Sequence, residues 1–280
     1  MKLFNKMQTF YKQAFEIRKL VLESLAEAGS GHTGGSLGLA DVFAVIYFKI
    51  LRHNPLNPDW EARDRLVLSI GHVAPVLYAT LAFTGYFPVE ELKTLRKLDS
   101  RLQGHPGRDF GLPGLELSAG SLGQGLSVAL GMALADKVDH KSRRTYCILG
   151  DGELQEGSVW EAIMAASHHQ TDNLCAIVDR NGLQIDGPTE QVMKLESLES
   201  RWKAFGWHVI PVDGHDHIAL IDAFEMAQKK KRKPTVIIAK TIMGKGVKSI
   251  ENDYRWHGKA PSKEQLAVFL EELNSSNRYD

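Results

Sequence analysis

The sequence predicts an α/β fold in which a mostly parallel β-sheet carries helices on both faces. Short apolar runs alternate with amphipathic helical stretches along the whole chain of 280 residues. The apolar runs fit buried strands, which are typical of parallel sheets covered by crossover helices. No repeat, low-complexity segment or linker interrupts the alternation, so we expect a single domain over residues 1–280.

The N-terminal region is predicted to be helical. Residues 6–28 carry an apolar stripe at helical spacing and stop at Gly29-Ser30-Gly31. His32 follows among glycines, and Ser36 is expected to cap a second helix over residues 39–51. The stripe of the first helix consists of Phe10, Ala14, Ile17, Val21 and Leu25.

Two further histidines lie beside glycine before residue 120. A strand at 65–69 ends in Gly71-His72 and leads into a helix at 73–84, so His72 lies at a helix N-terminus, where anions bind. Residues 99–120 are rich in glycine and proline, contain His105 and are predicted to form a functional loop.

The remaining elements continue the alternation of strand and helix. A glycine-rich segment, Ser-Leu-Gly-Gln-Gly at 121–125, is not a Walker loop, because no Gly-Lys-Ser/Thr follows it. Glycine also breaks the loop at 241–246, and Trp256-His257-Gly258 lies in the next loop. Helices are predicted over residues 126–137, 198–205, 216–229 and 262–273. A further helical run, between the strands at 146–149 and 174–178, carries Val159, Ile163 and Ala166 on one face. The predicted strands are 146–149, 174–178, 208–212 and 235–240.

Oxygen ligands follow two of these strands. Gly150-Asp151-Gly152 ends one strand, and Asn181-Gly182 follows the other. In a parallel sheet both ends lie at the same edge, where ligands bind. A carboxylate, an amide oxygen and a nearby backbone carbonyl suit Mg²⁺, which usually keeps positions open for phosphates. Two ordinary β-turns would also place Asp and Asn beside glycine.

Composition excludes several classes of protein. The 34 basic residues balance the 34 acidic ones, so neither nucleic acid nor a membrane is an expected partner. No apolar run reaches about 18 residues, and the N-terminus lacks the apolar core of a signal peptide. Cys147 and Cys175 fall in predicted buried strands, as packing residues in a reduced compartment do. We therefore expect a cytoplasmic protein.

Six motifs, in order along the chain, resemble transketolase. They are SGH near the start, GH after a strand, GHPG, GSLGQG, GDGELQEG followed about thirty residues later by Asn, and WHGK near the end. The resemblance covers the N-terminal, diphosphate-binding part of a typical transketolase. It implies the thiamine-diphosphate-binding fold, and the chain looks like one subunit of a split transketolase.

The resemblance implies a role for each matched residue. Mg²⁺, for which Ca²⁺ or Mn²⁺ can substitute, would be bound by Asp151, Asn181 and the carbonyl of Leu183. The diphosphate of thiamine diphosphate would lie beside His72, Gly152, Asn181, Lys240 and His257, and its rings beside Gly120, Ser121 and Leu122. The sugar would face His32, His105 and His257. Glu156 resembles the family's interface glutamate. Thr33 stands where many members carry proline.

The implied reaction transfers a two-carbon ketol unit from a ketose phosphate to an aldose phosphate, as in the pentose phosphate pathway. In the family, the glutamate that activates the aminopyrimidine belongs to the pyrimidine domain. The expected partner is therefore a C-terminal transketolase subunit carrying the pyrimidine and C-terminal domains, in an α2β2 heterotetramer. Alternatives are the α subunit of a 2-oxo-acid dehydrogenase, a fragment of deoxyxylulose-phosphate synthase, and a non-catalytic cofactor-binding subunit. Glu156 and the histidines disfavour the first two.

Overall fold

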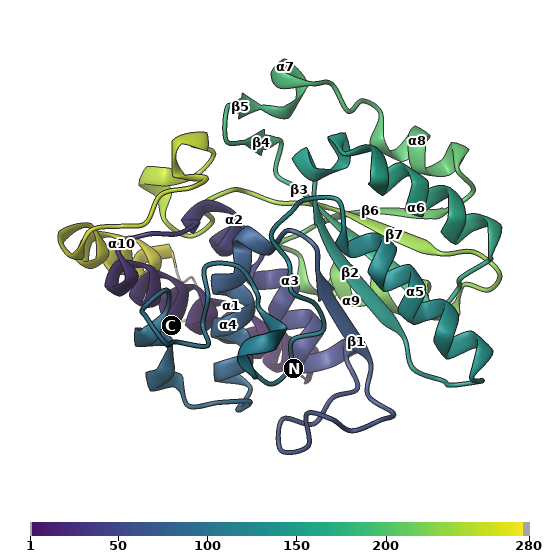
Figure 1. Ribbon diagram of the computed structural model, residues 1–280. Helices are drawn as coiled ribbons and strands as arrows, with labels where there is room; N and C mark the ends of the chain where they lie inside the picture. Colours follow the sequence, from purple (N-terminus) through teal and green to yellow (C-terminus); the bar gives the residue numbers. More distant parts are fainter. Residues whose placement is uncertain (1, 277–280) are drawn as a thin grey trace.

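The computed structural model describes residues 2–276, and its centre is a five-stranded sheet with the strand order β1-β2-β3-β7-β6 (Figure 1). Every pair of neighbouring strands in this sheet is parallel, which confirms the predicted fold class. The predicted strands differ from the observed ones by at most two residues at either end. The strands are β1 (Arg65–Leu68), β2 (Thr145–Gly150), β3 (Leu174–Arg180), β6 (His208–Asp213) and β7 (Thr235–Lys240).

The register of the sheet places the predicted ligand-bearing strand ends side by side. Gly150 at the end of β2 lies opposite Asp179 of β3. Arg180 at the end of β3 lies opposite Lys240 of β7. The turn after β2, the turn after β3 and Lys240 therefore share the carboxyl edge of the sheet, as expected for parallel strands.

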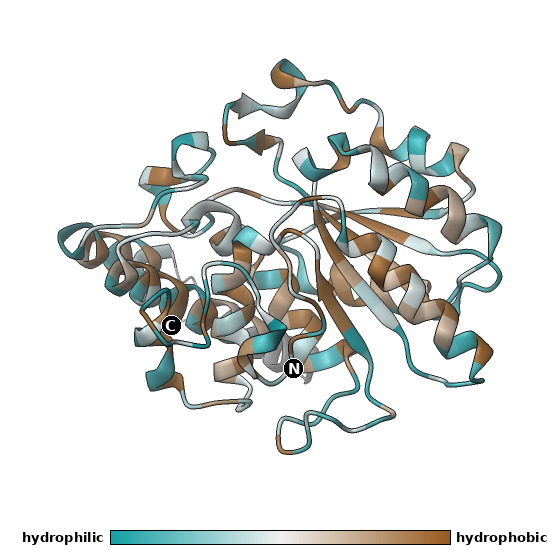
Figure 2. Cartoon of the chain, in the orientation of Figure 1, coloured by the Kyte–Doolittle hydropathy of each residue, from teal (hydrophilic) through white to brown (hydrophobic). Residues whose placement is uncertain are grey.

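Apolar side chains fill both faces of the sheet, because successive residues of a strand point to opposite faces. Tyr146 and Ile148 of β2 belong to one core cluster, and Cys147 and Leu149 belong to the other. Figure 2 shows the hydrophobic strands in brown between the helices. The first face is covered by α1 (Lys2–Ala28), α3 (Ala40–Val45), α4 (Ala74–Phe83) and α9 (His217–Lys229), and the second by α5 (Gly125–Val138), α6 (Gly157–His168) and α8 (Leu198–Ala204).

The region after α1 differs from the single helix predicted over residues 39–51. It contains α2 (Thr33–Gly38), α3 and a π-helical turn at Ile46–Ile50. The prediction that Ser36 caps a helix is wrong, because Ser36 lies inside α2 and donates a hydrogen bond to the His32 carbonyl at 2.8 Å. A Cβ at Gly34 would lie 2.5 Å from Met243, so the glycines let a short helix pack closely at this point.

The segment between β3 and α8 contains elements that the sequence analysis missed. A two-stranded antiparallel hairpin pairs β4 (Leu183–Gln184) with β5 (Gly187–Pro188), and α7 (Thr189–Val192) follows it. Strands this short carry no periodicity that a sequence pattern can reveal. The hairpin packs through β5 against the turn at Tyr254–Trp256, which precedes His257 and the last helix, α10 (Lys263–Ser276).

The sequence predicts no membrane-spanning helix and two buried cysteines. Among residues 2–276, no helix combines the length and the apolar character needed to cross a membrane. Cys147 and Cys175 are completely buried in β2 and β3, where they act as packing residues.

Candidate active site

Four histidines from four separate segments form a cluster, which we call the histidine cluster: His32, His72, His105 and His257. His32 precedes α2, His72 follows β1, His105 lies in the loop at 99–120, and His257 follows the turn at Tyr254–Trp256. The ring centroid of His32 lies 4.9 Å from that of His72, 5.6 Å from that of His257 and 6.3 Å from that of His105. The sequence prediction that these residues share a site is thus consistent with their placement.

Close packing of loops brings the histidines together. A Cβ at Gly71 would lie 2.9 Å from the Ala119 carbonyl carbon, so only glycine lets the turn after β1 touch the loop that carries His105. Gly120 continues that loop beside the His105 ring. Ser121 is exposed and Leu122 is half-buried, both next to Gly120 at the rim of the cluster.

The imidazoles of the cluster are held in their neutral form. Burial is the main cause that lowers the pKa of His72 to about 3 and that of His32 to about 4, and the neighbouring histidines contribute to both values. Loss of solvent also lowers the pKa values of His105 and His257, and Arg96 adds to the effect on His105. A neutral imidazole has one donor and one acceptor nitrogen, so it can exchange a proton with a hydroxyl group.

Two nitrogen atoms of the cluster have no partner among the described residues. The Nδ1 atoms of His32 and His257 are buried and make no hydrogen bond to any described residue. Buried polar atoms of this kind are uncommon and need a partner from elsewhere. Their position in a cluster of neutral imidazoles suits a polar ligand such as a sugar or a phosphate ester.

The predicted metal ligands lie at the carboxyl edge of the sheet. The buried Asp151 carboxylate accepts hydrogen bonds from the backbone N–H of Gly152 at 2.8 Å and of Gly182 at 2.7 Å. It also contacts the Arg180 guanidinium at 3.1 Å. The Asn181 amide donates to Asp179 at 2.9 Å, and its oxygen accepts from the Leu183 N–H at 2.9 Å. The Asp151 carboxylate therefore lies against the turn that carries Asn181.

The type of ligand atom fits Mg²⁺ better than a softer metal. Within the described part of the chain, no three His, Cys, Asp or Glu side chains gather as a metal site. A cation at Asp151 would therefore rely on amide and backbone oxygen atoms, which Mg²⁺ accepts. Burial raises the pKa of Asp151, and burial together with the nearby Asp151 carboxylate raises that of Asp179 to about 7. A divalent cation would relieve this accumulation of buried negative charge.

A cavity of about 1010 Å³ follows the same edge. Asn181 and Lys240 line it from the ends of β3 and β7, and Thr241 lines it from the segment that follows. Lys240 is exposed and is one of the residues that line the cavity. The lining also includes Glu196, Glu199 and Asp213, and Asp151 is not part of it. Of the predicted metal ligands, Asn181 therefore faces this cavity together with Lys240.

Glu153 is a site residue that the sequence analysis missed. Its carboxylate is buried and accepts hydrogen bonds from the backbone N–H of Gly123 at 2.8 Å, the N–H of Gly150 at 3.0 Å and the Ser69 hydroxyl. Burial raises its pKa, whereas these hydrogen bonds lower it. Glu153 thus ties the glycine-rich segment at 121–125 to the turn of Asp151. Its position directly after Gly-Asp-Gly was the available signal.

Glu156, predicted to lie at a subunit interface, differs from Glu153 in its surroundings. It is exposed on the surface just before α6, although it is only three positions further along the chain. A Cβ at Gly123 would lie 2.7 Å from the Glu156 Cβ, so Glu156 lies against the glycine-rich segment. Its carboxylate remains available to a group outside this chain.

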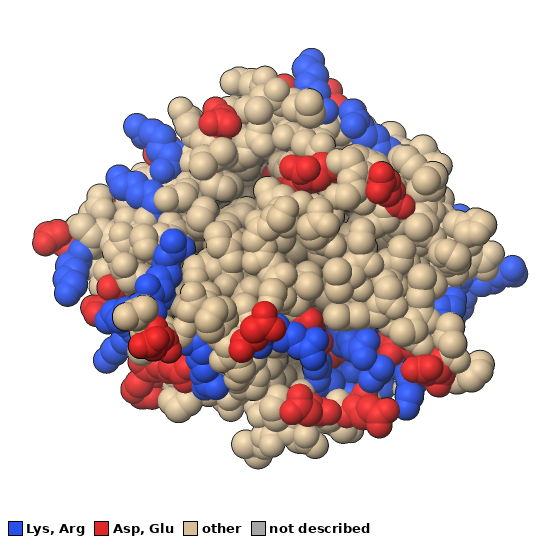
Figure 3. Space-filling view, viewed as in Figure 1, with Lys and Arg blue, Asp and Glu red and all other residues tan. Residues whose placement is uncertain are grey.

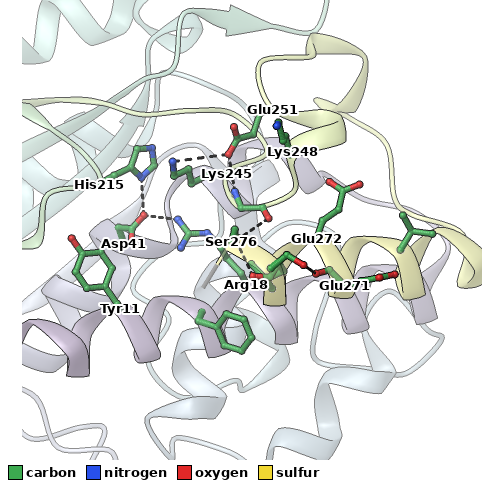
Figure 4. Close-up of a pocket in the computed structure, with 15 residues that line it drawn as sticks. Tyr11, Arg18, Asp41, His215, Lys245, Lys248, Glu251, Glu271, Glu272 and Ser276 are labelled. Carbon is green, nitrogen blue, oxygen red and sulfur yellow. Dashed lines mark hydrogen bonds and ion pairs between the residues drawn. The ribbon is translucent and has the colours of Figure 1, made fainter. Parts of the chain in front are cut away.

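A buried network supports the segment after Lys240. Asp41 accepts a hydrogen bond from His215 at 2.7 Å and is paired with Arg18 (Figure 4). It also accepts a hydrogen bond from His217 at 2.8 Å. His215 in turn accepts from the Ile242 backbone N–H at 2.9 Å. Burial raises the pKa of Asp41, but Arg18 and the two histidines outweigh burial and hold it well below its ordinary value. This network fixes the backbone next to Lys240 beside a separate cavity of about 840 Å³.

Comparison with known proteins identifies the family. A family model described as "Transketolase, thiamine diphosphate binding domain" matches residues 11–276. The chain belongs to the transketolase family. Two curated relatives of similar length are themselves named as subunits. A 6-deoxy-6-sulfo-D-fructose transketolase subunit of Clostridium sp. strain MSTE9 is 45% identical over 261 residues, which are 93% of this chain and 94% of the relative. An apulose-4-phosphate transketolase subunit of Phocaeicola vulgatus is 41% identical over 96% of this chain and 95% of the relative.

Longer transketolases match over their corresponding part. Human transketolase is 42% identical over 96% of this chain, which corresponds to 43% of the human protein. The transketolase structure from Leishmania mexicana superposes with a TM-score of 0.90 at 34% identity, over 97% of this chain and 42% of that chain. The structure from Campylobacter jejuni gives 0.89 at 37% identity, over 98% and 43%. The chain thus spans about two-fifths of these longer proteins.

These matches confirm the predicted family, the fold and the assignment of the chain as a transketolase subunit with a thiamine-diphosphate-binding domain. They favour this assignment over the 2-oxo-acid dehydrogenase and deoxyxylulose-phosphate synthase alternatives. The individual roles of the histidines, of Glu156 and of the metal ligands remain predictions.

Proposed function

We propose that this chain is the diphosphate-binding subunit of a two-subunit transketolase that transfers a two-carbon ketol unit from a ketose phosphate to an aldose phosphate. The observation that carries the proposal is the histidine cluster of neutral, partly unpartnered imidazoles, combined with oxygen ligands at the neighbouring sheet edge. The first region suits proton transfer on a sugar, and the second suits a metal diphosphate.

Thiamine diphosphate would be held at the carboxyl edge of the sheet. Asp151, Asn181 and the Leu183 carbonyl would bind Mg²⁺, while Gly152, His72, Lys240 and His257 would face the diphosphate. Gly120, Ser121 and Leu122 would line the rings. When bound, the cofactor supplies the electron sink for breaking and forming the carbon–carbon bond. The chain itself supplies charge neutralisation, orientation and proton transfer.

The histidine cluster would act on the sugar. The buried Nδ1 atoms of His32 and His257 would each take a hydrogen bond from a ligand hydroxyl or give one to it. His105 is exposed at the rim and would hydrogen-bond the donor ketose near its carbonyl or first hydroxyl. Because the pKa values of all four imidazoles are lowered, they remain neutral at pH 7 and can accept the proton of a hydroxyl.

A partner subunit would complete the site. Figure 3 shows a broad area without charged side chains across the middle of the face that carries α5 and the neighbouring loops. Met164 of α6 is 59% exposed. We infer that a pyrimidine-domain subunit binds here in an α2β2 assembly, with Glu156 and α5 at the centre.

The donor would be a ketose with an anionic group at its far end. The two subunit relatives are named for a sulfosugar and for a sugar phosphate. Phosphate and sulfonate share a tetrahedral anionic form, and basic side chains on the partner would recognise either. The acceptor aldose would enter the same site after the first product leaves.

The test compares donor classes with the partner subunit present. The assembled protein is supplied with Mg²⁺ and thiamine diphosphate, then with ketose phosphates, a 6-sulfo ketose or 2-oxo acids, each with an aldose phosphate acceptor. Transfer of a two-carbon unit from a ketose is expected. Decarboxylation of a 2-oxo acid without ketol transfer would refute the proposed reaction, and cofactor binding without any turnover would indicate a non-catalytic subunit.

A further inference from the structure

Arg180 connects a predicted metal ligand to the segment that follows the hairpin. Its guanidinium contacts the Asp151 carboxylate at 3.1 Å and donates to the Thr189 hydroxyl at 2.8 Å. The other terminal nitrogen donates to the Glu190 carboxylate at 2.7 Å. Arg180 therefore has two carboxylate partners, one in the turn after β2 and one in α7.

The two carboxylates differ in their surroundings. The Asp151 side chain is 2% exposed, and its other hydrogen bonds come from the backbone N–H groups of Gly152 and Gly182. The Glu190 side chain is 30% exposed, and it accepts a weaker hydrogen bond of 3.3 Å from the Leu195 N–H. Within residues 2–276, Arg180 is the basic side chain in contact with Asp151.

A guanidinium and a divalent cation repel each other strongly at hydrogen-bonding distance in a partly buried site. Both favour the same oxygen atoms of Asp151, because each is attracted to the carboxylate charge. Glu190 and Thr189 give the guanidinium partners that do not involve Asp151. The side chain can therefore leave the metal ligand without losing all its hydrogen bonds.

We propose that the Arg180 guanidinium competes with the divalent cation for the Asp151 carboxylate, and that Glu190 and Thr189 retain the guanidinium when the cation binds. Arg180 then weakens the binding of the cation, and Glu190 strengthens it by drawing Arg180 away. Arg180 is in this sense a residue that tunes metal affinity. The inference rests on the proposed metal site at Asp151.

Metal binding would also change the segment that carries Glu190. The Thr189 N–H donates to the Gly182 carbonyl at 2.9 Å, which links α7 directly to the turn of Asn181. When the Arg180 guanidinium leaves Asp151, the hydrogen bonds that it keeps are those to Thr189 and Glu190. The rate at which the backbone amide hydrogens of residues 180–190 exchange with solvent should then depend on whether the cation is bound.

The test measures Mn²⁺ binding to the assembled two-subunit protein at saturating thiamine diphosphate, from the loss of the free Mn²⁺ signal in electron paramagnetic resonance. R180Q should bind Mn²⁺ about fivefold more tightly than the unmodified protein, because no guanidinium then competes for Asp151. E190Q should bind it about fivefold more weakly, because it removes the partly exposed ion pair that draws Arg180 away from Asp151. The matched controls are K229Q and E225Q, which remove one charge each from an exposed pair on α9. Neither control should change the affinity.

The signs of the two effects distinguish competition from simple structural support. If Arg180 only stabilised the segment around Asn181 or bound the diphosphate, R180Q would weaken Mn²⁺ binding. That result would overturn the inference. Equal weakening by R180Q and E190Q overturns it as well. A protein that does not bind Mn²⁺ with thiamine diphosphate at all refutes the proposed metal site itself, which is a separate outcome. Hydrogen exchange over residues 182–197 of each variant checks that the segment remains folded.

Discussion

The carboxyl edge of the sheet around Asp151 and Asn181 differs from the histidine cluster in its charge and in its hydrogen bonding. At the edge, Asp151 and Asn181 have their oxygen atoms engaged by backbone N–H groups and by Arg180, and negative charge accumulates in a buried place. In the cluster, the imidazoles are neutral and two of their nitrogen atoms lack partners in the described structure. Under the proposed function, the first region would bind by charge and the second would transfer protons on an uncharged group.

The strongest test of this division removes the charge at the edge. Asp151→Ala should lower the affinity for Mg²⁺ and thiamine diphosphate more than a hundredfold, and Asn181→Ala roughly tenfold to a hundredfold, because a metal ligand is lost in each. Calorimetry with the partner present measures both. Unchanged cofactor affinity in both variants would show that the metal binds elsewhere.

Glu153 ties the glycine-rich segment at 121–125 to the turn of Asp151, and its removal should destabilise the fold. Glu153→Ala would leave the N–H groups of Gly123 and Gly150 and the Ser69 hydroxyl without their buried acceptor. We expect a loss of about 3 kcal/mol in the free energy of unfolding, since each unsatisfied buried donor costs about 1–3 kcal/mol. Urea denaturation provides the measurement, and Glu156→Ala is the exposed control. A loss equal to that of the control would contradict the role of Glu153.

In the cluster, removal of an imidazole should affect turnover rather than binding. His105→Ala should reduce kcat about a hundredfold with cofactor affinity nearly unchanged, because one hydrogen bond in the transition state is worth about 3 kcal/mol. His168→Ala, at the exposed end of α6, is the matched control. Full turnover, or failure to bind the cofactor, would remove His105 from the sugar site.

The smallest effect concerns pH. Because the pKa of His32 is lowered from 6.5 to about 4 in the folded protein, the unfolded chain binds a proton first as the pH falls. The free energy of unfolding should therefore decrease between pH 6.5 and pH 4, and His32→Gln should reduce the decrease between pH 7 and pH 4.5 by about 2 kcal/mol. Urea denaturation at pH 7, 5.5 and 4.5 tests this. An identical pH dependence in both proteins would mean that His32 is not held neutral by burial.

The two regions also differ in how far the sequence could predict them. The oxygen ligands followed from strand ends, since the parallel register fixes Gly150 opposite Asp179. The gathering of the histidines was inferred from the resemblance, because loops separate them and no periodicity relates His32 to His257. Glu153 and Arg180 were missed, since their importance depends on contacts across the sheet edge. The placement of Ser36 failed because tertiary packing around Gly34 starts a helix early.

The central claim is that this chain supplies both regions but only half of a working site. The most direct measurement is ketol transfer from a ketose phosphate by the purified chain, with Mg²⁺ and thiamine diphosphate, before and after addition of the pyrimidine-domain subunit. We predict negligible transfer by the chain alone and full restoration by the partner, with an interface of more than about 2,000 Å². Robust turnover by the isolated chain would contradict the account.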